Sequence, residues 1–215
     1  MKKTRLTLKN LLILAVLLAC SAASQTLSLK ADIGVCAVWD CVSLNVYELT
    51  GFPVGTFSII GNSCFVLIQL LILRRDFPPI RFLQVGVALI FGVVVNLCYY
   101  HIFTFEVSGY PMRIVLCILS YLLLAIFVGG VTLINLAQTP GEGLCYILQE
   151  RFGLNFSWTR MGLDLICICV SLLITLFFHT PLRVREGTII GMVLLGPVMN
   201  WCMKWERPLL EKVLD

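Results

Sequence analysis

The sequence has little charge. Charged residues make up 13% of its 215 residues, whereas hydrophobic residues make up 59%. Typical soluble domains carry roughly a quarter charged residues, so this composition excludes an ordinary soluble or exported domain. The dyad alternation of apolar and polar residues that transmembrane β-strands require is missing too. The chain consists instead of long apolar runs separated by short polar joints. These features predict an all-α membrane protein in contact with the lipid bilayer.

The motifs of common enzyme and metal sites are also missing. The sequence contains no HExxH, GxSxG or Walker A motif. Its ten cysteines form no CxxC pair, and most lie inside apolar runs, where cysteine acts as a small apolar residue. We therefore expect no enzymatic activity, no metal and no cofactor. The net charge of +4 is distributed as membrane topology demands, so no nucleic-acid partner is expected.

Six apolar runs come close to the roughly 20 residues that a helix needs to cross a bilayer. They cover residues 11–29, 56–73, 82–104, 112–136, 157–178 and 187–203. Residues 204–215 then form a tail on the cytoplasmic side.

The first run poses a choice between a cleaved lipoprotein signal and a retained helix. A basic leader, an apolar core and Cys20 fit a signal. However, Leu18 is bulky for the middle of a lipobox, and a polytopic protein seldom needs a cleaved leader. We predict a retained helix with a cytoplasmic N-terminus.

Positively charged residues predict the same orientation. With six spans and the N-terminus inside, eleven Lys and Arg residues fall in inside segments. The four in outside segments are Lys30, Arg113, Arg183 and Arg185. Both termini are therefore expected on the cytoplasmic side.

A weak internal repeat relates the two halves of the chain. At an offset of 102 residues, TGFPVGTFSIIGN falls on FGLNFSWTRMGLD, which places Asn62 on Asp164. With two more residues of slip, FGVVVN falls on LGPVMN, which places Asn96 on Asn200. The repeat predicts two units, residues 1–104 and 112–203. Because each unit has three spans, the second must be inverted relative to the first, as in many secondary transporters.

Each unit also contains a segment too short to span the bilayer, residues 35–50 and 140–152. In the first, apolar side chains occupy one helical face and polar ones, including Asp40, the other. In the second, Thr139 as N-cap and Glu142 at the third helical position predict a capping box. We expect interfacial or re-entrant helices at opposite membrane faces.

Three stretches resemble the YczE-like bacterial membrane proteins, which are related to the YitT group. They are ADIGVCAVWDCVSLNVYELTGFPVGT (31–56), LILRRDFPPIRFLQVGVALIFG (71–92) and REGTIIGMVLLGP (185–197). The first is similar to a Gly-Val-x-Pro-Trp-Asp type of signature, and the third to a Gly-Thr followed eight residues later by Gly-Pro. Two positions depart from the pattern: Val38 replaces the proline, and Glu186 precedes Gly187. The resemblance implies a small polytopic protein of the bacterial cytoplasmic membrane whose first helix is retained, and it implies no particular activity.

Ionisable groups in a bilayer cost roughly 2.5–3.5 kcal/mol each, so they mark candidate sites. Asp164 lies in the fifth predicted span, one turn after Arg160. Either Asp164 binds a coupling proton or cation, or the two side chains form an intrahelical ion pair. Asn62, its repeat partner, and Asp40 complete the candidate substrate or ion site. A helix resting on the headgroups would explain Asp40 equally well.

Other polar and small residues are expected in structural roles. Acidic residues are favoured in the first turn of a helix. Small residues and proline allow close contact between helices or a kink, and asparagines can form hydrogen bonds between helices. The residues expected in these roles are Glu142, Glu186, Gly187, Gly196, Pro197, Asn96 and Asn200.

Two functions from different classes remain open at this point. The first is a small secondary transporter or permease, coupled to protons rather than ATP, with its site between the two units. The second is a scaffold or accessory subunit that binds a protein partner or lipid. A polar cavity reached by Asp164 would favour the transporter. The sequence leaves open whether the chain forms a homodimer.

Overall fold

The computed structural model describes residues 7–34, 38–134, 136 and 138–213, and within them it contains helices and no strand. Six helices are long and apolar enough to cross a membrane. In the described residues they contain α1 (Leu8–Ala31), α3 (Val54–Leu73), α4 (Leu83–Leu97), α5 (Tyr110–Ile134), α7 (Phe156–Phe178) and α8 (Glu186–Val213), and α4 belongs to a longer helical stretch, Pro79–Ile102. The π-helical turn Cys98–Ile102 extends α4. The predicted all-α fold with six candidate spans is confirmed.

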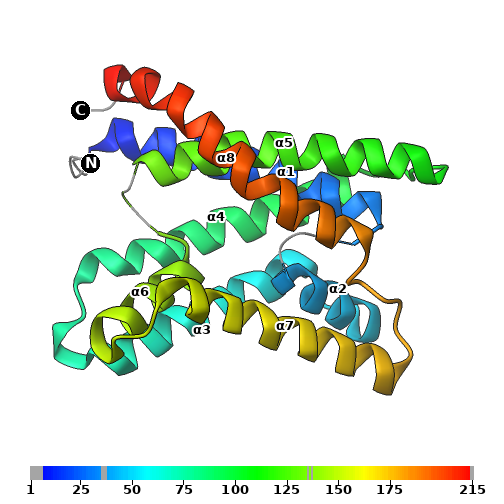
Figure 1. Cartoon of the computed structure of the whole chain (residues 1–215), viewed down its shortest axis with the longest axis horizontal. Helices are drawn as coiled ribbons and strands as arrows, with labels where there is room; N and C mark the ends of the chain where they lie inside the picture. The colour runs from blue at the N-terminus through cyan, green and yellow to red at the C-terminus, as the bar shows by residue number, and fades with distance from the viewer. Residues whose placement is uncertain (1–6, 35–37, 135, 137, 214–215) are drawn as a thin grey trace.

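Two short helices complete the fold. Helix α2 (Val38–Thr50) follows α1, and α6 (Pro140–Phe152) follows α5. The bounds of α6 match the predicted segment, whereas the predicted start of the first segment, 35–37, lies outside the described residues. Figure 1 shows α2 and α6 towards opposite ends of the bundle and both chain termini at the same end. This placement agrees with an even number of candidate spans.

Helix α8 runs ten residues past the predicted end of the last span at residue 203. Hydropathy falls at Lys204, but helix propensity does not, because the following stretch is rich in Leu, Glu and Lys. Pro197 and Pro208 both lie inside the helix. A transmembrane helix tolerates proline where its neighbours take up the freed backbone groups. Residues 204–213 therefore continue the last helix.

The helices form two groups (Figure 1). In the first, α5 packs against both α1 and α8; in the second, α3 packs against α2, α4 and α6. Helix α4 also packs against α1 and so joins the groups. One apolar cluster at this junction contains Ala22 and Leu29 of α1, Leu44 of α2 and Val95 of α4.

The packing of the short helices is reciprocal. Helix α2 packs against α7, and α6 packs against α3, its counterpart in the other predicted unit. Each short helix ends at a glycine with a left-handed backbone, Gly51 at φ 69° and Gly153 at φ 66°. The other pairs are less alike: α3 packs along α4, but no comparable packing joins the described residues of α7 and α8. The inverted repeat therefore stays a prediction.

Helix α2 is buried within the fold, and part of its predicted polar face, Asp40 and Ser43, lies inside. Asp40, Ser43 and Asn45 are at most 7% exposed, whereas the apolar Leu49 is 41% exposed. The reason is that long helices surround α2, so polar side chains can lie inside when other helices supply hydrogen-bond partners. A helix resting on the headgroups, as one alternative for Asp40 required, does not describe α2.

The predicted capping box of α6 is not formed. Thr139 lies at the N-cap but makes no side-chain capping bond. Pro140 occupies the first turn, where its missing N–H costs nothing. Glu142 lies in the same turn, which agrees with its expected place near the helix N-terminus. Glu186 likewise begins α8, and its carboxylate contacts Arg185 at 3.4 Å.

The interhelical role predicted for Asn96 is confirmed. Its side-chain oxygen accepts a hydrogen bond from the N–H of Gly55 at 2.8 Å, and its amide donates to Thr56 Oγ1 at 2.9 Å. Asn96 of α4 therefore caps the N-terminus of α3, which has no side-chain cap of its own. Asn200, its predicted repeat partner, is exposed and makes no side-chain hydrogen bond among the described residues.

The two glycines of the last helix differ in their packing. A Cβ on Gly187 would lie 2.4 Å from the backbone oxygen of Gly34, so close helix contact is confirmed there. The Gly187 N–H also donates to the backbone oxygen of Ile33 at 2.8 Å. A Cβ on Gly196 would meet no atom within 4 Å, so Gly196 makes no close helix contact, and the alternative of a kink at Gly196 and Pro197 stays a prediction.

Candidate functional site

A stripe of buried polar residues follows one face of α1. Ser21, Ser24, Gln25 and Ser28 are each at most 3% exposed, although they lie in an apolar helix. Their spacing of three and four residues places them on the same side. Each serine hydroxyl donates to a carbonyl three or four residues earlier at 2.8 Å. The serines are therefore satisfied within α1, and Gln25 is the member that reaches another helix.

Gln25 holds the carboxylate of Asp40. Its Nε2 donates to Asp40 Oδ2 at 2.5 Å, from the middle of α1 to the first turn of α2. Asp40 is 7% exposed. Burial raises the pKa of Asp40 to about 6, and the hydrogen bond from Gln25 only partly opposes this. Asp40 is thus a buried group that exchanges a proton close to neutral pH.

Helix α2 runs alongside the last turns of α1. Gln25 meets Asp40, and one turn further along both helices Ser28 and Leu44 line the same cavity. Because Gln25 lies six residues before Ala31, where α1 ends, the first turn of α2 is nearly two turns inside the fold. Asp40 is therefore level with the interior of α1 rather than with its end.

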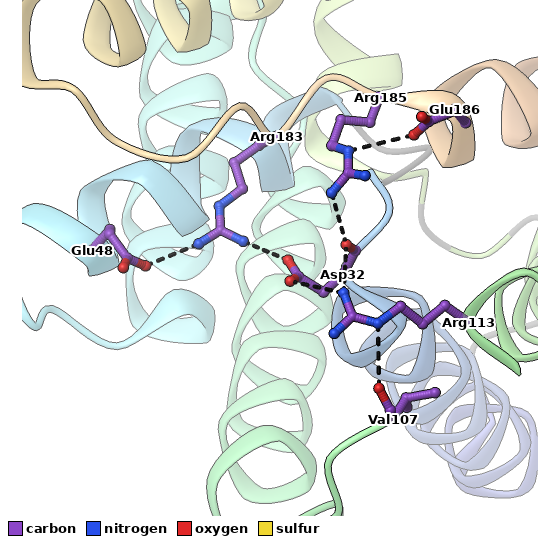
Figure 2. A network of polar contacts seen from close by, with 7 residues as sticks. All are labelled: Asp32, Glu48, Val107, Arg113, Arg183, Arg185 and Glu186. Atoms are coloured by element: carbon purple, nitrogen blue, oxygen red, sulfur yellow. Dashed lines mark hydrogen bonds and ion pairs between the residues drawn. The ribbon is translucent and has the colours of Figure 1, made fainter. Parts of the chain in front are cut away.

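Arg183 bridges the C-terminal ends of α1 and α2 (Figure 2). Arg183, in the loop between α7 and α8, donates to Asp32 at 2.7 Å and to Glu48 at 2.9 Å. Asp32 caps the end of α1, and Glu48 lies near the end of α2. Arg183 is only 15% exposed, so this bridge lies largely inside the fold.

Two further arginines converge on Asp32 (Figure 2). Arg113, at the start of α5, contacts the carboxylate at 3.4 Å, and Arg185 donates to the backbone oxygen of Asp32 at 3.2 Å. Asp32 has a left-handed backbone, with φ 51° and ψ 40°. Aspartate is among the few residues that tolerate this region. The conformation ends α1 and places the carboxylate among the three arginines.

A cavity lies between this network and the Gln25–Asp40 pair. It is a small hollow, partly open to solvent, in which the centre of a water molecule has about 10 Å³ to occupy. Its lining consists of Ser28, Leu29, Asp32, Gly34, Leu44, Leu182 and Arg183. Ser28 is one turn from Gln25 and Leu44 one turn from Asp40, so the cavity lies one helical turn from the buried pair without being lined by it.

Polar side chains also fix the far sides of both short helices. Asn45 of α2 donates to the backbone oxygen and the hydroxyl of Ser171 on α7, at 3.0 and 2.9 Å. Gln69 of α3 donates to the backbone oxygen of Pro140 on α6 and to Gln84, both at 2.9 Å. Gln69 and Ser171 are 102 residues apart, which is the offset of the predicted repeat. Each therefore anchors the short helix of the other unit.

The other predicted site residues lie in simpler surroundings. Arg160 contacts Asp164 at 3.3 Å within α7, and the two side chains are 44% and 34% exposed. The structure thus shows the intrahelical ion pair. Asn62 donates to the backbone oxygen of Ser58 within α3 at 2.9 Å. In the described part of the chain, no hydrogen bond or ion pair joins Asp40, Asn62 and Asp164. A role of Asn62, Asp164 and Arg160 in substrate or ion binding stays a prediction.

Sequence reasoning missed Gln25, Asp32 and Arg183. A signal for Gln25 was present, because SAASQTLS places four polar residues at helical spacing inside an apolar span. Asp32 and Arg183 are 151 residues apart, and nothing local connects them. Within the described ranges, no group of three or more His, Cys, Asp or Glu residues could hold a metal ion.

The long apolar helices and the buried short ones define a polytopic α-helical membrane protein. The chain belongs to a family of unknown function, DUF6198, which matches residues 8–204. It is also similar to the uncharacterized membrane protein YczE of Bacillus subtilis (strain 168), with 24% identity over 173 residues. This match covers 80% of the present chain and 75% of that protein. The YczE-like resemblance is therefore confirmed. No solved structure matches the chain.

Proposed function

We propose that the protein is a small secondary carrier of a bacterial cytoplasmic membrane and that Asp40 and Gln25 form its substrate or coupling-ion site. The observation that carries this proposal is the position of Asp40. Its carboxylate is buried in the first turn of a short helix, and a small cavity lies one helical turn away from it.

A buried carboxylate is costly and needs a compensating role. Gln25 supplies one hydrogen bond, and no salt bridge to Asp40 is present among the described side chains. The carboxylate can therefore bind a proton or a cation. Partly unwound or re-entrant segments near the middle of the membrane are where secondary carriers place such sites. In this proposal the chain moves a solute without changing it chemically and is not an enzyme.

The reciprocal packing of the short helices supports an inverted repeat. Helix α2 lies against α7 and α6 against α3, and the bonds from Ser171 and Gln69 to these helices are related by the same offset. Two inverted units would rock around a shared site to open each side in turn. We propose this arrangement, with both termini on the cytoplasmic side.

One observation favours the alternative, a scaffold or accessory subunit. Only 6% of the apolar stretch of α7 is buried inside the fold, against 44% for α1 and α5. Its exposed apolar side chains include Leu165, Ile166, Leu173, Leu176 and Phe177. Lipid covers such a surface equally well, as does a protein partner or a second copy of the chain.

The test is solute flux into proteoliposomes under an imposed pH gradient, with a panel of metabolites and cations. Asp40→Asn removes the buried carboxylate, and Asp164→Asn is the matched control, since it makes the same change on the partly exposed face of α7. We expect gradient-driven flux in the wild type and the control and its loss in Asp40→Asn. Loss in Asp164→Asn alone would place the site on α7 instead. No flux of any solute through folded protein would favour the accessory subunit.

A further inference from the structure

We propose that Arg183 and the cavity beside it bind a small soluble oxyanion, the carboxylate or phosphate group of the transported solute, in exchange for the Asp32 carboxylate. This inference rests on the proposed carrier function and names its substrate class. It is argued from the contacts of Arg183, the exposure of Asp32 and the position of the cavity.

Arg183 has an unused donor inside the fold. Its two terminal nitrogens are bonded to Asp32 and Glu48, whereas its Nε is buried and has no hydrogen-bond partner. Leaving a buried donor unsatisfied is unfavourable, more so on a charged group. Arg183 also lines the cavity. Since a guanidinium can bind two oxygens of a carboxylate or phosphate side by side, an oxyanion in the cavity would satisfy the free donor.

Asp32 is the anion that such a ligand would replace. Its carboxylate is 51% exposed, and its contact with Arg113 at 3.4 Å is long. Its shorter contact, with Arg183 at 2.7 Å, is the one that the ligand would have to replace, and solvent at the exposed carboxylate weakens this ion pair. The three arginines and the carboxylates of Asp32, Glu48 and Glu186 balance in formal charge. Replacing one carboxylate with another preserves that balance, so the exchange costs little electrostatic energy.

The backbone of Arg183 is held in place independently of its side chain. Cys41 Sγ of α2 lies 3.6 Å from the backbone oxygen of Arg183. Arg185 and Arg113 flank the same site from the start of α8 and α5. A ligand that displaces Asp32 would therefore meet a preformed cluster of three positive charges.

The cavity also lies close to the proton site. Ser28 lines the cavity and lies one turn from Gln25, which holds Asp40. A solute anion moving inward would approach Asp40, and two carboxylates in a poorly hydrated space repel each other. A proton on Asp40 removes this repulsion. The geometry thus links inward movement of the anion to protonation of Asp40, which is proton symport.

The experiment measures binding of succinate and of inorganic phosphate to the full chain in detergent, by calorimetry. Arg183→Gln removes the charge and the donors, so we expect binding at least about tenfold weaker. Asp32→Asn tolerates the left-handed backbone and removes the competing anion, so we expect binding several-fold tighter. The matched control is Arg151→Gln, which removes an arginine paired with Asp76 at the other end of the bundle and should leave binding unchanged.

Arg183→Gln could bind less because it folds poorly. Arg183→Lys separates the two causes, because lysine keeps the positive charge but lacks the planar guanidinium. It should bind the probes more weakly than wild type while its melting temperature without ligand stays near the wild-type value. Unchanged or weaker binding in Asp32→Asn would overturn the proposal. So would a signal that appears only in nanodiscs with phosphatidylglycerol and not with phosphatidylcholine, because the ligand would then be a lipid headgroup.

These results separate the site from the carrier function. Binding with the expected response of the variants, but without flux, would retain the oxyanion site and reject the carrier. Gradient-driven flux of cations alone, without binding of either probe, would retain the carrier and reject the oxyanion site.

Discussion

The side-chain amide of Gln25 donates a 2.5 Å hydrogen bond to the carboxylate of Asp40 and so ties the middle of α1 to the first turn of α2. Two features follow from this bond. It holds α2 nearly two turns inside the fold, and it keeps a carboxylate where water has little access. The stability of the protein should therefore depend on pH through a single buried group.

The protonation of Asp40 should make the protein most stable in mild acid. Burial raises the folded-state pKa of Asp40 to about 6 from an ordinary value of 3.8. The folded protein therefore binds this proton more tightly, and the resulting stability is present below about pH 4 and lost as pH rises through about 6. The loss amounts to about 3 kcal/mol at most. Thermal unfolding in detergent between pH 4 and 7 measures it, and Asp40→Asn should remove this part of the dependence. An identical pH profile in wild type and variant would contradict it.

Gln25→Ala should destabilise the protein more at neutral pH than in mild acid. The substitution leaves the Asp40 carboxylate without its hydrogen-bond donor, which costs about 1–3 kcal/mol when the group is charged. When Asp40 is protonated, losing this hydrogen bond costs less free energy of unfolding. Measuring the free energy of unfolding at pH 4.5 and pH 7.5 tests this. In an Asp40→Asn background the same Gln25 substitution should lose its pH dependence, and a pH-dependent cost that persists there would show that Gln25 acts on another group.

Gly187→Ala should be strongly destabilising, whereas Gly196→Ala should not. A Cβ at Gly187 would meet the backbone oxygen of Gly34 at 2.4 Å, and backbone cannot move aside cheaply. Overpacking of this kind costs about 1–3 kcal/mol. At Gly196 there is open space, and alanine raises helix propensity by up to about 1 kcal/mol. Melting temperatures of the two purified variants should shift in opposite directions; a shared direction would contradict the packing at the start of α8.

Asn96→Ala should destabilise the N-terminus of α3. The substitution removes one capping bond to Gly55 and one bond to Thr56. Loss of a helix cap costs about 0.5–2 kcal/mol. Hydrogen exchange of the first turn of α3 should increase together with the loss of stability. Asn200→Ala, on the exposed surface of α8, is the control and should change stability by less than about 0.5 kcal/mol. Equal effects of the two substitutions would contradict the cap.

Hydropathy and helix signals in the sequence predicted most of the helices but not the contacts of Asp40 and Arg183. Runs of apolar residues predicted six candidate spans, and Pro140 and Gly153 predicted both ends of α6. Helix α8 continues past the predicted end of the last span because Lys204 lowers hydropathy without breaking a helix. The amphipathic pattern of α2 left open whether Asp40 lies at the headgroups or inside, because polar side chains among membrane helices, such as Asp40 and Asn45, can turn inward to find hydrogen-bond partners. The bridge from Arg183 to Asp32 depends on the tertiary fold and has no local signature.

The central claim is that protonation of Asp40 couples to solute movement. The most direct measurement follows solute-driven proton entry into proteoliposomes with a pH dye in the lumen, for wild type and Asp40→Asn. We expect the wild type to acidify the lumen when solute enters. Asp40→Asn should still exchange solute at equal concentrations on both sides but move no protons. If Asp40→Asn acidified the lumen at the wild-type rate, Asp40 would not be the coupling group.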